Sequence, residues 1–379
     1  VRKKNTSAIL LKNIALYSIA GIMFYLIGYS LMYVDVSGWI GSLGGAFYNP
    51  SSDELALLDG AENVAAIAET GYSVASDWFF QMVFCATAIS IVSGACAERI
   101  KVWPFMIFAA IMTGIIYPIF GSWTWGGGWL AEMGFSDFAG STIVHSVGGW
   151  AAVVGCLILG PRAGKYSKDG KISPIAGANM PLACLGTFIL WFGWFGFNGG
   201  SQLALGSALD AVAISIVVVN TNMAACGGVV AAIILSQLMY KKIDLSISLN
   251  GAIAGLVAIT AGPDLSNHFM SVIIGAIGGI LCTLAIPMLD KMKIDDVVGA
   301  ISAHLIAGIW GTLAVGIFGG GDLIVQIVGI LAAAALVVPL SAVGFYILKA
   351  TTGLRVDEET EAVGLDKAEL TTVAYPEFN

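Results

Sequence analysis

Charged residues are scarce in this chain of 379 residues. Asp, Glu, Lys and Arg together make up 11% of it, whereas a soluble domain carries about 25%. A soluble protein of this length needs more charge to cover its surface. The composition therefore excludes an ordinary water-soluble enzyme, a disordered chain and a nucleic-acid-binding protein. Apolar residues make up 58%, which indicates a protein that crosses a membrane several times.

Signatures of catalysis and of metal binding are missing as well. The six cysteines all lie in apolar segments, and none of them belongs to a Cys-x-x-Cys pair, so neither a disulfide framework nor a metal site is predicted. The glycine run 126–128 opens no helix with a Lys-Ser or Lys-Thr pair, which argues against a nucleotide site. We find no nucleophile with a neighbouring base. The sequence therefore predicts a protein that is not an enzyme and that has no cofactor.

Long apolar runs are what the sequence has in abundance. A helix needs about 20 mostly apolar residues to cross the hydrocarbon core, and the runs here are continuous rather than alternating, which argues against strands. The predicted spans cover residues 8–33, 72–96, 102–121, 141–160, 178–200, 207–238, 248–262, 268–288, 297–318 and 322–348. We predict an all-α polytopic membrane protein with ten spans.

Lys and Arg are absent from every second loop. All 17 of them fall near the two ends of the chain or in alternate connections, and short loops rich in Lys and Arg stay in the cytoplasm. A multi-pass domain over residues 1–349 and a cytoplasmic C-terminal tail over 350–379 are therefore predicted. The loop 34–71 on the other side carries six acids and no base. It is either a vestibule that gathers cations or an ordinary solvated loop.

Two of the three histidines fall inside predicted spans, where ionisable groups are costly and mark function by default. His145 lies in the fourth span and His304 in the ninth, which runs in the opposite direction. Two five-span halves would then be inverted copies, and such repeats place equivalent residues near one midplane site. Paired imidazoles can share a proton and line an apolar pore. The alternative is two separate histidines, each bonded to backbone carbonyls.

Aromatic residues gather at one predicted end of the spans. They are Trp123, Trp125, Trp129, Phe79, Phe80, Phe84, Trp191, Trp194, Phe195 and Phe197. An interfacial aromatic belt explains several of them. A cage for a small cation explains them too, because ring faces attract desolvated cations. Both interpretations stay open on the sequence alone.

Three further features concern helix ends and helix packing. Asp137 precedes the fourth span and either caps that helix or stabilises a cation near a pore mouth. Roughly 12 Å of helix separates it from His145, which argues against direct contact. The polar run 220–222 predicts hydrogen bonds between helices. Small-residue pairs predict close helix packing at Gly251 and Gly255, Gly275 and Gly279, and Gly196 and Gly200.

Several segments resemble the ammonium transporter family (Amt, within the Amt/Mep/Rh superfamily). The most specific runs from Asp137 to His145, Asp-Phe-Ala-Gly-Ser-Thr-Ile-Val-His, and continues to Gly160-Pro-Arg162. The other similar segments are Ser93-Gly-Ala-Cys-Ala-Glu-Arg99, Trp125-Gly-Gly-Gly128, Trp194-Phe-Gly-Phe-Asn198 and Gly353-Leu-Arg-Val-Asp-Glu-Glu. The similarity follows the family's order along nearly the whole chain, and together the motifs are highly specific.

The resemblance implies a homotrimer of the cell membrane that takes up ammonium, with one pore per subunit. It implies an outer recruitment site of Phe84, Trp125 and Ser201. Below that site it implies a stacked gate of Phe84 and Phe197, the pore histidines His145 and His304, and the structural acid Asp137. Ammonium would be captured and deprotonated, since low dielectric favours the neutral form. Ammonia would then cross, with separate proton transfer. A PII-type regulatory protein would act on the cytoplasmic tail.

The sequence departs from the family in one respect. Family members usually have eleven spans and an outer N-terminus, whereas ten are predicted here and the chain begins on the basic side. We therefore expect that the first family span is missing from this sequence. The alternatives are a gas channel of the Rhesus type, an ammonium sensor and an enzyme with a membrane substrate. Trp125 favours the Amt branch, a fused signalling domain would mark a sensor, and an enzyme would need a nucleophile or metal set.

Overall fold

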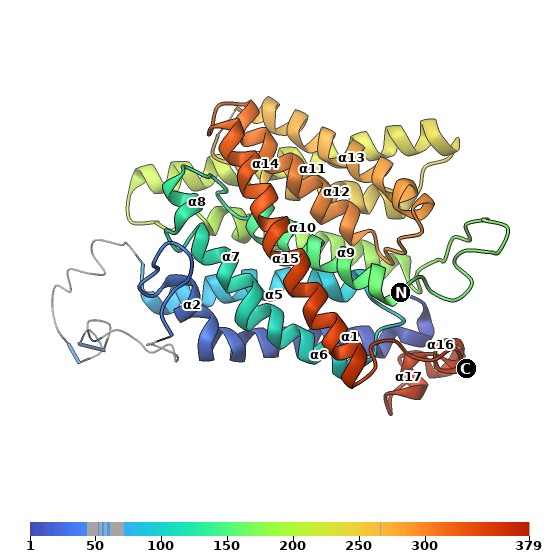
Figure 1. The fold of residues 1–379 in the computed structure, drawn as a ribbon. Coiled ribbons are helices and arrows are strands. Elements are labelled where there is room, and N and C mark those ends of the chain that lie inside the picture. Colours follow the sequence, from blue (N-terminus) through green and yellow to red (C-terminus); the bar gives the residue numbers. More distant parts are fainter. Residues whose placement is uncertain (44–51, 53–54, 57–58, 61–71, 266, 379) are drawn as a thin grey trace.

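The computed structural model describes residues 1–43, 52, 55–56, 59–60, 72–265 and 267–378 (Figure 1). Over these residues the chain forms a bundle of helices. Its β-structure there is limited to two isolated β-bridges. Most of the acidic loop 34–71 lies outside the described residues, so the cation vestibule stays a prediction. The acids concerned are Asp53, Glu54, Glu62 and Glu69.

The helices of the N-terminal part fill the predicted spans to within a few residues. In chain order they are η1 (Lys3–Asn5), α1 (Thr6–Met23), η2 (Phe24–Gly28), α2 (Tyr29–Tyr33), α5 (Val74–Ala95), α6 (Val102–Ile111), η3 (Met112–Ile116), α7 (Tyr117–Trp123), α8 (Trp129–Glu132), η4 (Ser141–Ser146) and α9 (Val147–Leu159). The segments η2, η3 and η4 are π-helical turns that continue the neighbouring α-helices.

The helices of the C-terminal part follow the same pattern and end in short tail helices. They are α10 (Met180–Gly200), α11 (Ala208–Tyr240), α12 (Leu245–Ile259), α13 (His268–Lys291), η5 (Ile301–Ile306), α14 (Ala307–Ile317), α15 (Leu323–Thr351), α16 (Glu358–Val363), α17 (Leu365–Ala368) and η6 (Pro376–Phe378). The segment η5 is again a π-helical turn.

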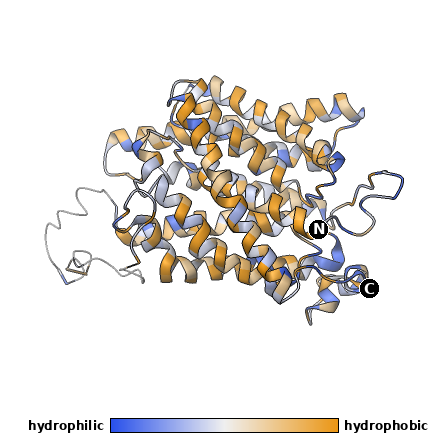
Figure 2. Cartoon of the chain, viewed as in Figure 1, coloured by the Kyte–Doolittle hydropathy of each residue, from blue (hydrophilic) through white to orange (hydrophobic). Residues whose placement is uncertain are grey.

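An apolar helix stands at each of the ten predicted positions. Eight of these helices are long and apolar enough to cross a membrane, and the two shorter ones cover Leu245–Ile259 and Ile301–Ile317. Hydrophobic residues predominate along the helices of the bundle, as Figure 2 shows. The prediction of an all-helical polytopic membrane protein is confirmed, while the number of spans stays a prediction.

Both termini lie at the same end of the bundle, together with α16 and α17 (Figure 1). We call this end the basic end, because Arg2, Arg99, Arg162 and Arg355 meet there in ion pairs and hydrogen bonds. The opposite end carries α8 and the tryptophans around it, and we call it the aromatic end. The one-sided distribution of Lys and Arg in the sequence thus corresponds to one end of the folded chain.

Glycines bring α11, α12 and α13 into close contact, as the small-residue pairs predict. A Cβ on Gly255 would lie 2.4 Å from the carbonyl oxygen of Ala224, and one on Gly275 would lie 2.0 Å from the same atom. A Cβ on Gly279 would lie 2.4 Å from the carbonyl oxygen of Gly228. The prediction is wrong for Gly196, which faces open space, because the outer face of α10 packs against no other helix of the described chain.

Candidate functional site

Three aromatic side chains, from two helices and the turn after α7, meet at the aromatic end. The ring centroids of Phe84 on α5 and Trp125 after α7 are 5.4 Å apart. The centroids of Phe84 and Phe197 on α10 are 4.4 Å apart, with an interplanar angle of 88°. The structure therefore brings Phe84, Trp125 and Phe197 together, as the resemblance implies. Phe84 is 1% exposed, so it lies fully buried at the centre of this aromatic group.

The expectation of a stacked gate is wrong in one respect, because Phe84 meets Phe197 edge to face. The cause lies on the other side of the Phe197 ring. The Phe197 ring stacks on the rings of Trp194 and His145. The centroid distances are 5.2 and 5.3 Å, and the interplanar angles are 28° and 20°. An edge-to-face approach places the positive edge of one ring against the negative face of another. The two phenylalanine rings are nevertheless in direct contact.

His145 and His304 form a direct pair inside the bundle. Their Nδ1 atoms are 3.1 Å apart, and their ring centroids are 5.1 Å apart with an interplanar angle of 22°. His145 is fully buried and His304 is half-buried. Since two neighbouring Nδ1 atoms can bond only as one donor and one acceptor, the pair shares one proton at this contact. The Nε2 atom of His145 has no hydrogen-bond partner among the described residues.

The two helices that carry the histidines cross at reciprocal glycines. Gly149 follows His145 by four residues, and a Cβ there would lie 2.6 Å from Cβ of Leu305. Gly308 follows His304 by four residues, and a Cβ there would lie 2.7 Å from Oγ of Ser146. Each histidine's following residue thus packs on the other segment's glycine. Any side chain at either glycine would push the imidazoles apart.

Asp137 caps the π-helical turn that carries His145. Its carboxylate accepts hydrogen bonds from four successive backbone N–H groups, those of residues 140–143, at 2.8–3.0 Å. The Asp137 carbonyl oxygen accepts a bond of 2.9 Å from Nε1 of Trp125. Gly140 makes the turn possible with φ of 106°, a value that favours glycine. Asp137 therefore holds in place both the π-helical turn that carries His145 and the indole ring of Trp125.

Ser201 ends the helix that also carries Phe197. Its hydroxyl donates a hydrogen bond of 2.8 Å to the Phe197 carbonyl oxygen, and the side chain is half-buried. This bond uses the hydroxyl proton and leaves both oxygen lone pairs for another donor. The hydroxyl can therefore accept a hydrogen bond from a cation that carries N–H groups.

Helix α10 is held to α11 and α12 by hydrogen bonds between side chains. The Asn198 amide donates to Thr221 Oγ1 at 2.9 Å, and Trp194 Nε1 donates to Thr260 Oγ1 at 2.9 Å. Trp191 Nε1 donates to Asn222 Oδ1 at 3.2 Å. The prediction that the polar run 220–222 bonds between helices is thereby confirmed. These bonds set the place of the α10 side chains in the site.

Other tryptophans of the aromatic end form a separate cluster. Trp39, Trp123 and Trp129 pack on one another with centroids 5.3–5.6 Å apart, and Trp123 Nε1 donates to the Trp39 carbonyl oxygen at 2.6 Å. Trp39 is 61% exposed. Their position fits an interfacial belt, while Trp125 alone of these tryptophans contacts Phe84. The rings of the aromatic end thus form two separate groups, and the belt and the cage both stay predictions.

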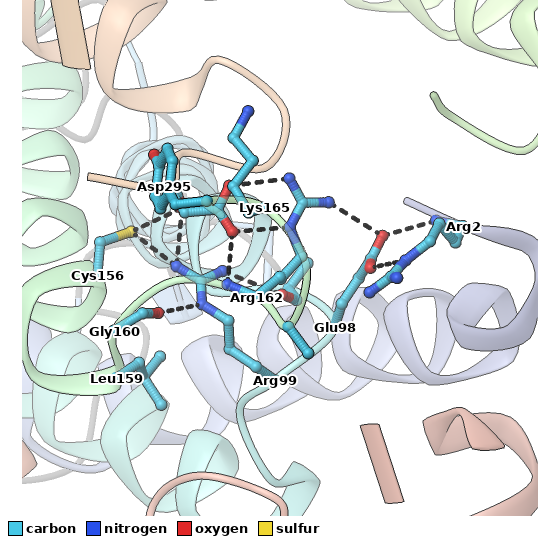
Figure 3. Close-up of polar contacts among 12 residues, drawn as sticks. Arg2, Glu98, Arg99, Cys156, Leu159, Gly160, Arg162, Lys165 and Asp295 are labelled. Carbon is cyan, nitrogen blue, oxygen red and sulfur yellow. Dashed lines mark hydrogen bonds and ion pairs between the residues drawn. The ribbon is translucent and has the colours of Figure 1, made fainter. Parts of the chain in front are cut away.

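Buried ion pairs join the loops at the basic end (Figure 3). The Arg162 side chain bonds both Asp295 oxygens, at 2.8 and 2.9 Å, and lies 3.4 Å from Glu98. Arg2 also pairs with Glu98. Arg99 donates to the backbone carbonyls of Gly160 and Asp295. Although burial acts to raise it, the pKa of Asp295 lies below its ordinary value because Arg162 favours the carboxylate.

The C-terminal tail folds back onto the basic end. Arg355 donates to the Leu159 carbonyl oxygen at 2.7 Å, and Glu361 accepts from the backbone N–H of Ala163 at 2.6 Å. Asp366 accepts from the first N–H groups of α1, and Glu369 from the N–H of Val102 at the start of α6. Asp357, Glu358 and Glu359 come first among the acids of the tail. The acids that reach other helices lie further on, and no spacing in the tail marks them.

Sequence reasoning also missed Asp296. Its carboxylate accepts from the N–H groups of Ala300, Ile301 and Ser302 at 2.7–3.4 Å, so it caps the π-helical turn η5. The signal is present in the sequence, because Asp296-x-x-Gly299-x-x-x-x-His304 has the same spacing as the run from 137 to 145. Only the first run carries the resemblance, so the second is easily overlooked as its repeat.

The third histidine takes a structural place. His268 is the first residue of α13, and its Nδ1 lies 2.8 Å from Oδ1 of Asn220. The six cysteines are free thiols. Within the described ranges, no group of three or more His, Cys, Asp or Glu side chains is placed to hold a metal ion.

The apolar helices define a polytopic membrane protein whose bundle contains a pair of imidazoles in contact with aromatic rings. The sequence model described as Ammonium Transporter Family matches residues 1–375, and the chain belongs to that family. It is 38% identical to ammonium transporter Amt2 of Archaeoglobus fulgidus, covering 100% of this chain and 83% of that protein. It is 41% identical to a putative ammonium transporter of Synechocystis, covering 97% and 81%.

Solved structures of the same superfamily share the fold. The structure of a sensor Amt protein superposes with a TM-score of 0.87 at 40% identity, covering 97% of this chain and 90% of that one. Mep2 of Saccharomyces cerevisiae superposes with a TM-score of 0.78 at 26% identity, covering 93% and 80%. The arrangement of helices described above is therefore that of the Amt/Mep proteins.

Proposed function

We propose that this protein is an ammonium transporter that captures the ammonium ion at the aromatic end, removes its proton and conducts ammonia past the histidine pair. The proton crosses separately. The observation that carries the proposal is the continuous column from Trp125 through Phe84 and Phe197 to His145 and His304, in which each ring contacts the next. Relatives and solved neighbours named ammonium transporter, Amt and Mep support the choice of substrate.

Recruitment is assigned to Phe84, Trp125 and Ser201. Two ring faces attract a desolvated cation by about 0.5–2 kcal/mol each, and the Ser201 oxygen accepts one of its N–H groups. Trp125 is held in place through its bond to Asp137, so the indole does not have to be ordered when the cation arrives. The role of Asp137 is structural, since all four of its backbone bonds are made to the turn that it caps.

Conduction is assigned to the two histidines. A bare ammonium ion in an apolar passage is far more costly than ammonia, so the ion gives up its proton before it passes Phe84 and Phe197. Below them His145 and His304 offer hydrogen bonds to ammonia, and their shared Nδ1 contact offers a route for the proton. Apart from the N–H proton that ammonium loses, no bond is broken or formed in this account, so we assign no enzyme activity.

The surroundings of the pore follow from the same proposal. The basic end faces the cytoplasm, because Lys and Arg are retained on that side, and the protein resides in the cell membrane as a homotrimer. The apolar outer face of α10 and α11 provides subunit contacts, since Leu185, Phe188, Ile189, Phe192 and Leu209 are more than half exposed in the single chain. A PII-type protein would reach the tail and the loops on which it packs.

The test is an electrical measurement on the whole chain in liposomes. An ammonium jump is expected to produce a saturable current, whereas equal jumps of sodium or potassium produce none. The matched control replaces Trp123, a tryptophan of the belt cluster, with Leu and keeps the wild-type current. If the correctly assembled protein carries neither current nor ammonium uptake, transport is the wrong function.

Deletion of residues 353–379 tests the regulatory role of the tail. If the shortened protein keeps both its activity and its PII binding, the tail has no such role.

Ammonium sensing is the second candidate, favoured by the similarity to the sensor Amt protein. A sensor would use the same aromatic mouth to bind the ion but would not need to conduct it. Ammonium binding measured by calorimetry without any current in the liposome assay would favour sensing over transport.

A further inference from the structure

We propose that Asp296 is a positioning residue of the inner pore, which holds His304 against His145 and links the histidine pair to the ion pairs of the basic end. The proposal rests on the transport function above and adds a residue to which the family resemblance assigns no role. Three observations carry it: the repeated spacing, the cap geometry and the contact with the buried ion network.

The first observation is that both histidine segments are built in the same way. In each, an Asp lies eight residues before the histidine, a glycine with positive φ lies five residues before it, and a π-helical turn carries it. The glycines are Gly140 with φ of 106° and Gly299 with φ of 76°. Because this geometry recurs on both sides of the pair, Asp296 stands to His304 as Asp137 stands to His145.

The second observation is that the Asp296 carboxylate determines the start of η5. Oδ1 accepts from Ala300, and Oδ2 accepts from Ile301 and Ser302. Both oxygens are therefore used as acceptors of backbone N–H groups. An asparagine would offer one acceptor and would turn an NH₂ group against the remaining N–H. The turn would shift, and the imidazole two residues beyond Ser302 would move with it.

The third observation is that the neighbouring residue is clamped. Asp295 bonds Arg162 through its side chain and Arg99 through its carbonyl oxygen, at 2.7–2.9 Å. The backbone that leads into Asp296 is thus fixed by two buried guanidinium groups. The Arg162 loop also receives the tail, through the Ala163 bond to Glu361. Because Asp295 is joined to Asp296 by a single peptide bond, a displacement of these loops would also move the cap of η5.

Asp296 also makes the inner pore sensitive to cytoplasmic pH. It lies outside the spanning helices. Burial raises its pKa to about 6, although its backbone N–H donors and Arg99 act to lower that pKa. The titratable groups that face it are Arg99 and Cys96 from the end of α5, Cys156 from α9 and Cys282 from α13. Above this pKa the carboxylate accepts at both oxygens. Below it one oxygen carries a proton, the cap weakens, and conduction falls.

The experiment measures ammonium-driven current in liposomes of the full chain, with the internal pH stepped from about 7.5 to about 5.5 at constant external conditions. Roughly three-quarters of a carboxyl group with a pKa near 6 is protonated at the lower value, so the wild-type current is expected to fall about fourfold. Asp296→Asn should carry about tenfold less current at the higher pH, since displaced reacting groups are costly. Its current should change less than about twofold over the pH step.

Two further variants separate positioning from general stability. Asp322→Asn alters another capping aspartate, which accepts from the N–H groups of Ile324 and Val325 at the start of α15. Because Asn is also a good cap, its current should stay within about twofold of the wild type. Asp296→Glu keeps the charge and should restore the pH step in part. An equal loss in the Asp322 variant, or a wild-type current that is flat between the two pH values, would overturn the proposal.

A spectroscopic readout keeps the test independent of transport. With ¹⁵N-histidine in the liposome-bound protein, Asp296→Asn should shift the His304 imidazole signals, and it should leave those of His268 in place. The three histidines are assigned by single replacement. If the wild type carries no current, the transport function fails, yet the His304 shift still decides the role of Asp296. Unchanged His304 signals would show that Asp296 does not position it.

Discussion

The two ends of the bundle are held together by different chemistry. At the aromatic end, rings pack on rings, and backbone amides surround the buried acid Asp137. At the basic end lie all the ion pairs found among the described residues, and Arg162 stands between two buried carboxylates. The comparison teaches that the geometry of the aromatic end depends on shape and that of the basic end on charge. Salt and pH should therefore act on the molecule mainly from the basic end.

The strongest test of this comparison lies midway between the two ends, at the histidine pair. We expect His145→Leu or His304→Leu to abolish ammonium-driven charge transfer, because either change removes the Nδ1 contact and adds bulk. Ammonium should still bind at the mouth, since the aromatic residues are untouched. The double variant should be little worse than either single one, because the two residues act as one unit. Wild-type current in either single variant, with assembly intact, would limit the histidines to lining the passage.

The next largest effect concerns the stability of the basic end. Arg162→Ala leaves two buried carboxylates with less compensation, so we expect it to lower the free energy of unfolding by about 3–5 kcal/mol near neutral pH. Thermal unfolding in detergent measures this effect. The exposed Lys168 provides the control, since Lys168→Ala should stay within about 0.5 kcal/mol.

The Arg162 effect should also depend on pH with a defined sign. The folded-state pKa of Asp295 is lowered, so the stability gained from this pair is present above the ordinary carboxyl pKa and disappears as the pH falls through the folded value. The variant and the wild type should therefore converge in acid. A constant difference down to strongly acidic pH would mean that Arg162 acts by packing alone.

The aromatic end should respond more weakly. Trp125→Leu removes one ring face at nearly constant bulk, and we expect half-saturation of uptake to move to about 2- to 30-fold higher ammonium, which corresponds to about 0.5–2 kcal/mol. Added salt should change this shift little. Trp123→Leu alters the belt cluster and should leave half-saturation in place. The same concentration dependence in both variants would assign Trp125 to the belt.

The smallest effect is expected in the tail. Asp366→Ala removes the carboxylate that accepts from the first N–H groups of α1, and lost caps cost about 0.5–2 kcal/mol. The exposed Glu359 serves as the matched acid, and Glu359→Ala should leave the unfolding midpoint unchanged. Equal midpoints for the two variants would show that tail contacts add no stability.

The sequence predicted the helices well because apolar runs report directly on spanning segments. The hydrogen bonds of residues 220–222 and the glycine contacts of α12 and α13 were predicted for the same reason, since buried polar and small residues in apolar helices have few other uses. The resemblance predicted which rings meet at Phe84. Their edge-to-face geometry was not predictable, because it depends on the stack formed by Phe197, Trp194 and His145.

What the sequence could not predict depends on contacts between distant segments. Glu361 and Asp366 look like other acids of a charged tail, and only the folded-back chain distinguishes them. Arg162 and Asp295 are 133 residues apart, and nothing local marks them as partners. The π-helical turns left no trace in the apolar pattern. Asp296 is the exception, since its spacing to His304 repeats the spacing of Asp137 to His145 in the amino-acid sequence itself.

Helix α10 carries Phe197 and ends at Ser201. Yet only 6% of the residues in an apolar stretch of 18 residues in this helix are buried, compared with 78% in Ser141–Leu159. In a lipid environment, apolar contact gives a helix little preference for one position over another, whereas interhelical hydrogen bonds do. A saturation mutagenesis map of α10 should therefore divide sharply. Its outward positions should accept nearly any apolar substitution, while Asn198 and its partners Thr221 and Thr260 should accept very few. The pattern of tolerated mutations would then follow the polar atoms of this helix rather than its hydrophobicity.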